Sequence, residues 1–116
     1  MDEKIEKAFE VVNYMATLSN QRKILAEEFN QNLSFYINGA TFKISPELIS
    51  FTKVILDSGN IKNIPFIDSN NLPVMIEDVA EFYDKILEQY LKELTDYADK
   101  YATIKSKRKI ADMIGL

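Results

Sequence analysis

The chain has 116 residues, with 14 basic and 18 acidic side chains and a formal net charge of −4. Apolar residues make up 47% and charged residues 28%, which excludes an intrinsically disordered chain and favours one folded domain over residues 1–116. Cysteine and histidine are both absent, so disulfides, thiol nucleophiles and thiolate metal sites are excluded, as is the commonest general base.

The first predicted element is a helix from Asp2 to about Leu33. Its apolar residues recur mostly at spacings of three, four or seven, as one face of a helix requires. They are Ile5, Phe9, Val12, Ala16, Leu18, Leu25, Phe29 and Leu33. The spacing slips at Ser19-Asn20-Gln21, so the pattern fits either one long helix with a weak middle or two helices split there.

A β-hairpin is predicted next, with strands at 34–37 and 41–44 on either side of Asn38-Gly39-Ala40. The strands are rich in β-branched and aromatic residues, and Asn-Gly supplies the positive φ angles of a tight turn. Alternation pairs four side chains across the strands: Phe35 and Ile37 with Phe42 and Ile44. Ser45-Pro46-Glu47 then begins a short helix, which Ser58-Gly59 ends.

A second pair of strands, at 64–67 and 72–76, surrounds Asp68-Ser69-Asn70-Asn71. Each strand carries a proline, which cannot donate a ladder hydrogen bond, so we expect both strands to be short or at an edge. The oxygen-rich segment 68–71 could bind calcium, but a turn held by its own side chains explains it more simply.

The last helix is predicted to open at Glu77-Asp78 and to run to Lys105 or beyond. Its apolar seam alternates by three and four, as a helix–helix contact requires. The seam comprises Val79, Tyr83, Ile86, Tyr90, Leu94, Tyr97, Tyr101 and Ile104, with Glu93 off the face. Its partner is either the first helix or a second copy. The fold class is therefore α+β: two long helices in an antiparallel pair, a short middle helix and two hairpins.

No catalytic, cofactor-binding or metal-binding residues are predicted. The many carboxylates follow helical spacing, and they match neither a calcium loop nor a Glu-x-x-His motif. There is also no glycine-rich phosphate loop and no nucleophile elbow. We therefore expect a non-enzymatic interaction protein. Its acidic net charge disfavours nucleic-acid binding, and no apolar run approaches a membrane span, so we expect no membrane association. An acidic N-terminus without a signal peptide favours a cytoplasmic location.

Residues 105–116 form a basic and then apolar C-terminal segment, which either packs back on the body or docks on a partner. If the hairpins mediate contact, their aromatic residues are the expected anchors, although the same residues fit a core equally well. The candidate partner-binding residues are Phe35, Tyr36, Phe42, Phe66, Lys107, Arg108, Met113 and Ile114. An alternative function is a regulator that contacts nucleic acid or the transcription machinery through the basic segment.

Several stretches of the chain resemble small proteins of T4-like marine tailed phages, cyanophages included. The resemblance spans about residues 20–110. Its motifs are Glu27–Asn32, Phe35-Tyr36, Asn38-Gly39, Phe42, Ser45–Ile49, Ile67-Asp68, Asn70-Asn71, Pro73-Val74 and Ile76–Asp78. It implies a virion assembly or minor structural factor, present in the host cytoplasm and in the virion, with itself or phage structural proteins as partners.

Overall fold

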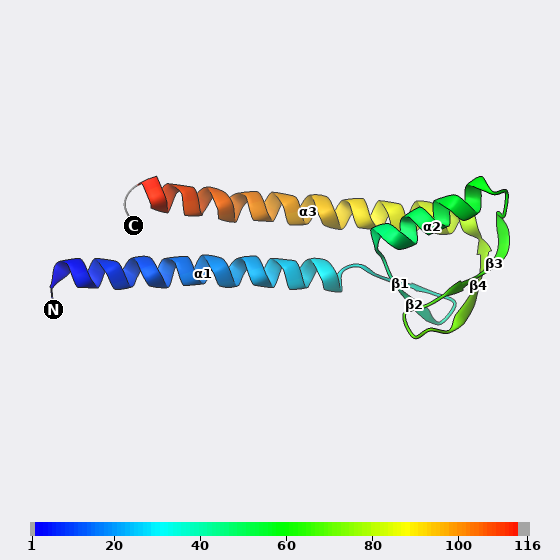
Figure 1. Ribbon diagram of the computed structural model, residues 1–116, viewed down its shortest axis with the longest axis horizontal. Helices are drawn as coiled ribbons and strands as arrows, with labels where there is room; N and C mark the ends of the chain where they lie inside the picture. Colours follow the sequence, from blue (N-terminus) through cyan, green and yellow to red (C-terminus); the bar gives the residue numbers. More distant parts are fainter. Residues whose placement is uncertain (1, 114–116) are drawn as a thin grey trace. The chain divides into compact units, whose positions relative to one another are not determined.

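The computed structural model describes residues 2–113, and their side chains except those of residues 108 and 110–113. The elements follow the order α-ββ-α-ββ-α, so the α+β prediction is confirmed (Figure 1). They are α1 (Glu3–Gln31), β1 (Ser34–Ile37), β2 (Ala40–Lys43), α2 (Pro46–Asp57), β3 (Lys62–Ile67), β4 (Pro73–Asp78) and α3 (Val79–Met113).

The chain divides into two compact units, and α3 contributes to both. The helical unit combines α1 up to Phe29 with the part of α3 that begins at Thr95. The hairpin unit comprises residues 30–94, which include both hairpins, α2 and the first turns of α3.

In the helical unit, α1 and α3 run side by side in opposite directions (Figure 1). The Phe29 ring meets the edge of the Tyr97 ring, with 4.9 Å between centroids, and the Arg22 guanidinium lies 5.4 Å from the Tyr101 centroid. Moving back along α1 therefore means moving forward along α3, which confirms the antiparallel pair. The seam residues of α1 are Val11, Met15, Leu18, Arg22, Leu25 and Phe29, each buried or half-buried.

α1 is one continuous helix, so the alternative of two helices split at Ser19-Asn20-Gln21 is wrong. The slip in spacing marks a change of face instead. Ile5, Phe9 and Val12 are 47%, 57% and 63% exposed, whereas Leu18 is 3% exposed. Each of these three exposed residues comes one position after a residue on the line of the seam. At 3.6 residues per turn, they therefore lie about 100° round the helix axis from the seam.

Each hairpin is a separate two-stranded antiparallel sheet. Asn38 and Gly39 form the first turn with φ angles of 50° and 75°, as a type I′ turn requires. Phe35 pairs with Phe42 as predicted, but Ile37 pairs with Ala40 because the turn has two residues rather than three. Ile44 therefore lies beyond the ladder, where its N–H donates to the Leu33 carbonyl at 2.6 Å.

The short helix α2 begins as its sequence predicts. The Ser45 hydroxyl accepts a hydrogen bond from the Leu48 N–H at 3.1 Å, and Pro46 occupies the first helical position. Ser58 and then Gly59, with φ of 88°, end the helix. α3 begins in a similar way, because the Asp78 carboxylate accepts from the Glu81 N–H at 3.0 Å.

The core of the hairpin unit centres on Phe82, which is 1% exposed. Its ring meets the edges of the Phe35, Phe42 and Phe66 rings, with centroids 5.7, 5.2 and 5.3 Å away. One side chain of α3 thus joins both hairpins. Val79 and Ile86, three residues before and four after Phe82, are both 0% exposed and complete this face of the helix.

Candidate interaction surfaces

The predicted aromatic anchors lie in different environments. Phe42 and Phe66 are 1% and 2% exposed, which places them in the core of the hairpin unit. Phe35 is half-buried against Phe82, and Tyr36 is 74% exposed on the opposite face of its strand. Tyr36 is thus the one of these four aromatic side chains that has most of its surface free to contact a partner.

The C-terminal candidates fall partly outside the described residues. Lys107 is exposed on α3, as are Lys105 and Lys109. The side chain of Arg108 and that of Met113 lie outside the described part, as does Ile114 altogether. The backbone of α3 continues through the basic cluster as far as Met113, so this segment begins as an extension of the helix.

The β3–β4 hairpin is apolar on both faces. Ile64, Phe66, Val74 and Ile76 form the inner face, and Phe66 and Ile76 are buried. The other face carries Glu77 near the end of β4, and its apolar part, which we call the outer hairpin face, consists of Pro65 opposite Met75 and Ile67 opposite Pro73. All four are exposed, Ile67 by 61% and Met75 by 50%. An antiparallel sheet with one solvated face normally alternates apolar and polar residues, and this hairpin does not.

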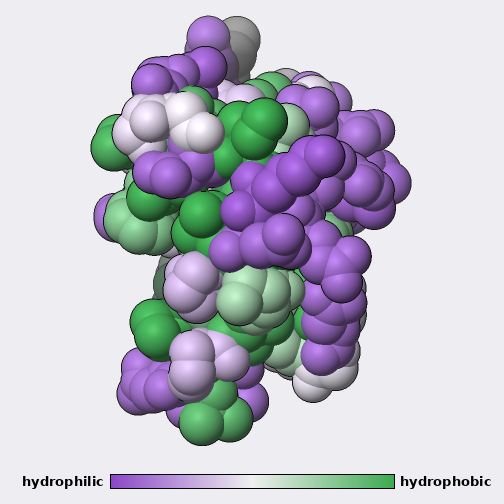
Figure 2. All heavy atoms as spheres, turned by 90° about the vertical axis from the view of Figure 1, so that its right-hand side faces the viewer, coloured by the Kyte–Doolittle hydropathy of each residue, from purple (hydrophilic) through white to green (hydrophobic). Residues whose placement is uncertain are grey.

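Leu72 adds to the apolar character of this end of the hairpin, because it is 58% exposed beside the turn. The turn itself is held by hydrogen bonds to one side chain. The Asp68 carboxylate accepts from the N–H groups of Asn70 and Leu72, both at 2.9 Å, which confirms the turn interpretation of residues 68–71. Figure 2 views the molecule from the β3–β4 side and shows apolar residues in several places there, interrupted by hydrophilic ones.

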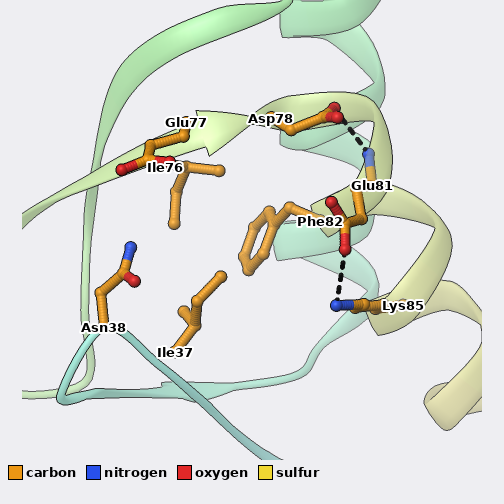
Figure 3. Close-up of a pocket in the computed structure, with 8 residues that line it drawn as sticks. All are labelled: Ile37, Asn38, Ile76, Glu77, Asp78, Glu81, Phe82 and Lys85. Atoms are coloured by element: carbon orange, nitrogen blue, oxygen red, sulfur yellow. Dashed lines mark hydrogen bonds and ion pairs between the residues drawn. The ribbon is translucent and has the colours of Figure 1, made fainter.

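A pocket of about 140 Å³ lies between the first hairpin, the end of β4 and the start of α3 (Figure 3). It is smaller than the pockets that hold drug-sized ligands, which start at about 300 Å³. Most of its polar side chains have structural partners: Asp78 caps α3, Glu81 pairs with Lys85 at 2.7 Å, and the Asn38 amide donates to the Met75 carbonyl at 3.1 Å. The last of these bonds holds the first turn beside β4.

Among the described residues, no group of three or more carboxylates is arranged to hold a metal ion. No described helix combines the length and the apolar character that crossing a bilayer requires.

Two side-chain environments in α3 differ from the predicted seam. Phe82 is the centre of a core, although the predicted seam passes through Tyr83; the signal available was its spacing from Val79 and Ile86. The prediction that Leu94 is in the seam and Glu93 outside it is wrong. Leu94 is 40% exposed, while Glu93 is half-buried and accepts from the Asn32 amide at 3.1 Å.

No family model, no curated protein and no solved structure matches this chain.

Proposed function

We propose that this protein is a non-enzymatic interaction protein that works as an oligomer and binds other proteins through the outer hairpin face. The observation that supports the proposal is the double apolar character of the β3–β4 hairpin. Exposed contiguous apolar surface on a folded protein marks interaction sites. Burying Pro65, Ile67, Pro73 and Met75 against a partner would give this sheet two covered faces, as its composition requires.

The prolines favour contact through the face of the hairpin rather than through its edges. Each strand has one outer edge, because the sheet has only two strands. Pro65 and Pro73 have no N–H to offer to an added strand. A partner therefore gains more by packing on the side chains of Ile67 and Met75 than by extending the ladder.

The biological setting in this proposal is phage virion assembly, either as an assembly factor or as a minor structural component. It rests on the sequence resemblance to small proteins of marine tailed phages. The alternative, a regulator that contacts nucleic acid, is supported by the exposure of Lys105, Lys107 and Lys109 near the end of the described part of α3.

Site-specific photo-crosslinking tests the proposed surface. A photoreactive residue replaces Met75 on the outer hairpin face or, as a control, Lys53, an exposed residue of α2. The protein is then irradiated in the cells in which it is made. We expect discrete protein adducts from position 75 that position 53 does not give. Identical adducts from both positions, or none from position 75, would contradict the proposal.

Salt dependence separates the two functions. Binding driven by phosphate contacts weakens steeply between low and moderate salt, whereas a mainly apolar protein interface changes little. Light scattering over a range of protein concentrations measures the mass in solution. A mass that remains that of one chain throughout would refute the oligomer, and salt-sensitive binding to nucleic acid would favour the regulator.

A further inference from the structure

We infer that the N-terminal half of α1 is a self-association surface that binds the same segment of a second copy, with the two helices antiparallel. The surface, which we call the outer row, consists of Ile5, Phe9, Val12 and Ala16. The inference rests on the proposal that the protein works as an oligomer, and it identifies the residues that form the contact.

The outer row has the spacing of a helix–helix seam. Its members are four, three and four residues apart, so they follow one stripe along the helix. All four are exposed, and the three larger ones expose 47–63% of their surface. The neighbouring seam to α3 already occupies Val11, Met15 and Leu18. With both stripes, the apolar residues of this half of α1 span an arc of about 180° at 100° per residue, which suits a helix with more than one helical neighbour.

The seam with α3 does not cover this row. Phe29 lies opposite Tyr97, so sixteen residues back along α1 and sixteen forward along α3 bring residue 13 opposite Met113. Ile5 and Phe9 therefore lie beyond the last described residue of α3. The row also lies about 100° round the helix from the seam, and Ala16 is exposed at a level where α3 is present.

The side of the helical unit on which the row lies is identified by two hollows. One, of about 310 Å³, is lined by Arg22, Tyr101, Ile104 and Lys105. The other, on the opposite side of the seam, is lined by Gln21, Ile24, Leu25, Lys100, Thr103 and Ile104. By helical periodicity, the stripe of the outer row extends through Ser19 and lies on the same side of the seam as Arg22 and the first hollow. Lys105 and Lys109, one turn apart, lie on that same side.

Charge complementarity favours a second copy as the partner, with its α1 antiparallel to the first. In an antiparallel pair Ile5 lies opposite Ala16 and Phe9 opposite Val12. Asp2, which continues the row, then reaches the level of Ser19 in the other copy. Within that copy, the α1–α3 register places Ser19 at a level of α3 that lies between Lys105 and Lys109. Lys23 is one turn away along α1, and all three lysines are exposed.

A parallel pair would be electrostatically unfavourable. It would place Asp2 and Glu6 of one copy beside the same two carboxylates of the other, and like charges at helix contacts destabilise them. The outer row is also smaller than a standard interface of about 800 Å² per partner. We therefore expect a dimer whose population rises with protein concentration.

Analytical ultracentrifugation of matched variants tests the surface. Phe9→Glu places a charge in the outer row, and Ile24→Glu makes the same change at a residue of α1 that is 52% exposed on the other side. We expect at least a tenfold weaker dimer for Phe9→Glu, and an unchanged one for Ile24→Glu. Circular dichroism establishes that both variants keep the helix content of the wild type.

The charge contribution is tested in the same way. Lys105→Glu should weaken the dimer, whereas Lys107→Glu, an exposed lysine on the Thr103 side of α3, should leave it unchanged. Equal effects of these two changes would refute the electrostatic part of the inference.

Cysteine pairing tests the direction, because the chain has no native cysteine. A disulfide needs Cα atoms about 4.4–6.8 Å apart. A mixture of Ile5→Cys and Ala16→Cys should therefore form the mixed disulfide, and Ile5→Cys alone should not crosslink. Crosslinking of Ile5→Cys to itself would refute the antiparallel arrangement.

The outcomes separate this inference from the proposed function. A wild-type protein that is monomeric at every concentration refutes both the oligomer and the outer-row dimer. A wild-type oligomer that Phe9→Glu leaves intact refutes the outer-row dimer alone. Crosslinking at Met75 reports on the outer hairpin face whichever of these results is found.

Discussion

Replacing Phe82 with alanine should destabilise the hairpin unit more than any other single truncation of an aromatic ring in it. The Phe82 side chain is 1% exposed and its ring contacts three others, namely those of Phe35, Phe42 and Phe66. Those contacts join the two hairpins to α3. The alanine would leave a cavity at the point where the three elements meet.

The size of the effect follows from burial and ring geometry. Truncating a buried Phe to Ala costs about 3–5 kcal/mol, because transfer energy is lost and a cavity remains. Each edge-to-face ring pair adds about 0.5–1.5 kcal/mol to simple area burial, so three pairs favour the upper part of that range. Small domains are stable by about 5–15 kcal/mol in total, so the variant should be close to unfolding.

Urea denaturation followed by far-ultraviolet circular dichroism measures this loss, since the chain has no tryptophan for fluorescence. Phe51→Ala is the matched control, because Phe51 is 52% exposed and its one ring contact is with Phe66 at 5.7 Å. We expect the control to lose about 1 kcal/mol of unfolding free energy, because it loses one ring pair and only part of a buried surface. A Phe82→Ala loss no larger than that of Phe51→Ala would refute the central position assigned to Phe82.

Three further changes test local features by urea denaturation. Tyr97→Asp should cost more than about 2 kcal/mol, because it removes the ring contact with Phe29 and places a charge in the helix seam; wild-type stability would contradict the seam. Ser45→Ala should cost about 1 kcal/mol by removing the cap on Leu48, and Ser45→Asp should retain most of the stability. Gly39→Ala should cost about 1 kcal/mol or more, because a φ of 75° strains a residue with a Cβ while the space around it is open; an unchanged midpoint would contradict the type I′ turn.

Local signals in the sequence were sufficient to predict the type of each helix and strand. Asn38-Gly39 predicts a turn because few other pairs accept two positive φ angles, and Ser45-Pro46 predicts a helix start because both residues suit its first turn. These effects depend on neighbours in the chain alone. The order of helices and hairpins follows from them.

The side-chain environments could not be predicted in the same way, because they depend on residues far apart in sequence. The contact between Phe82 and two hairpins requires knowing how three elements meet. Leu94 and Glu93 both fit a spacing of three or four from their neighbours, and Asn32, sixty-one residues from Glu93, decides between them. Spacing also detected the slip in α1 without revealing whether it was a break or a change of face.

The two apolar stripes of α1 have a consequence for how this chain can vary. Leu18, Leu25 and Phe29 contribute to folding because they pack within the helical unit. The outer row contributes little to that packing, so its residues can change with small effects on the stability of a single chain. Mutations at Ile5, Phe9 and Val12 can therefore change the proposed self-association while the protein still folds, so that folding and association can evolve separately on one helix.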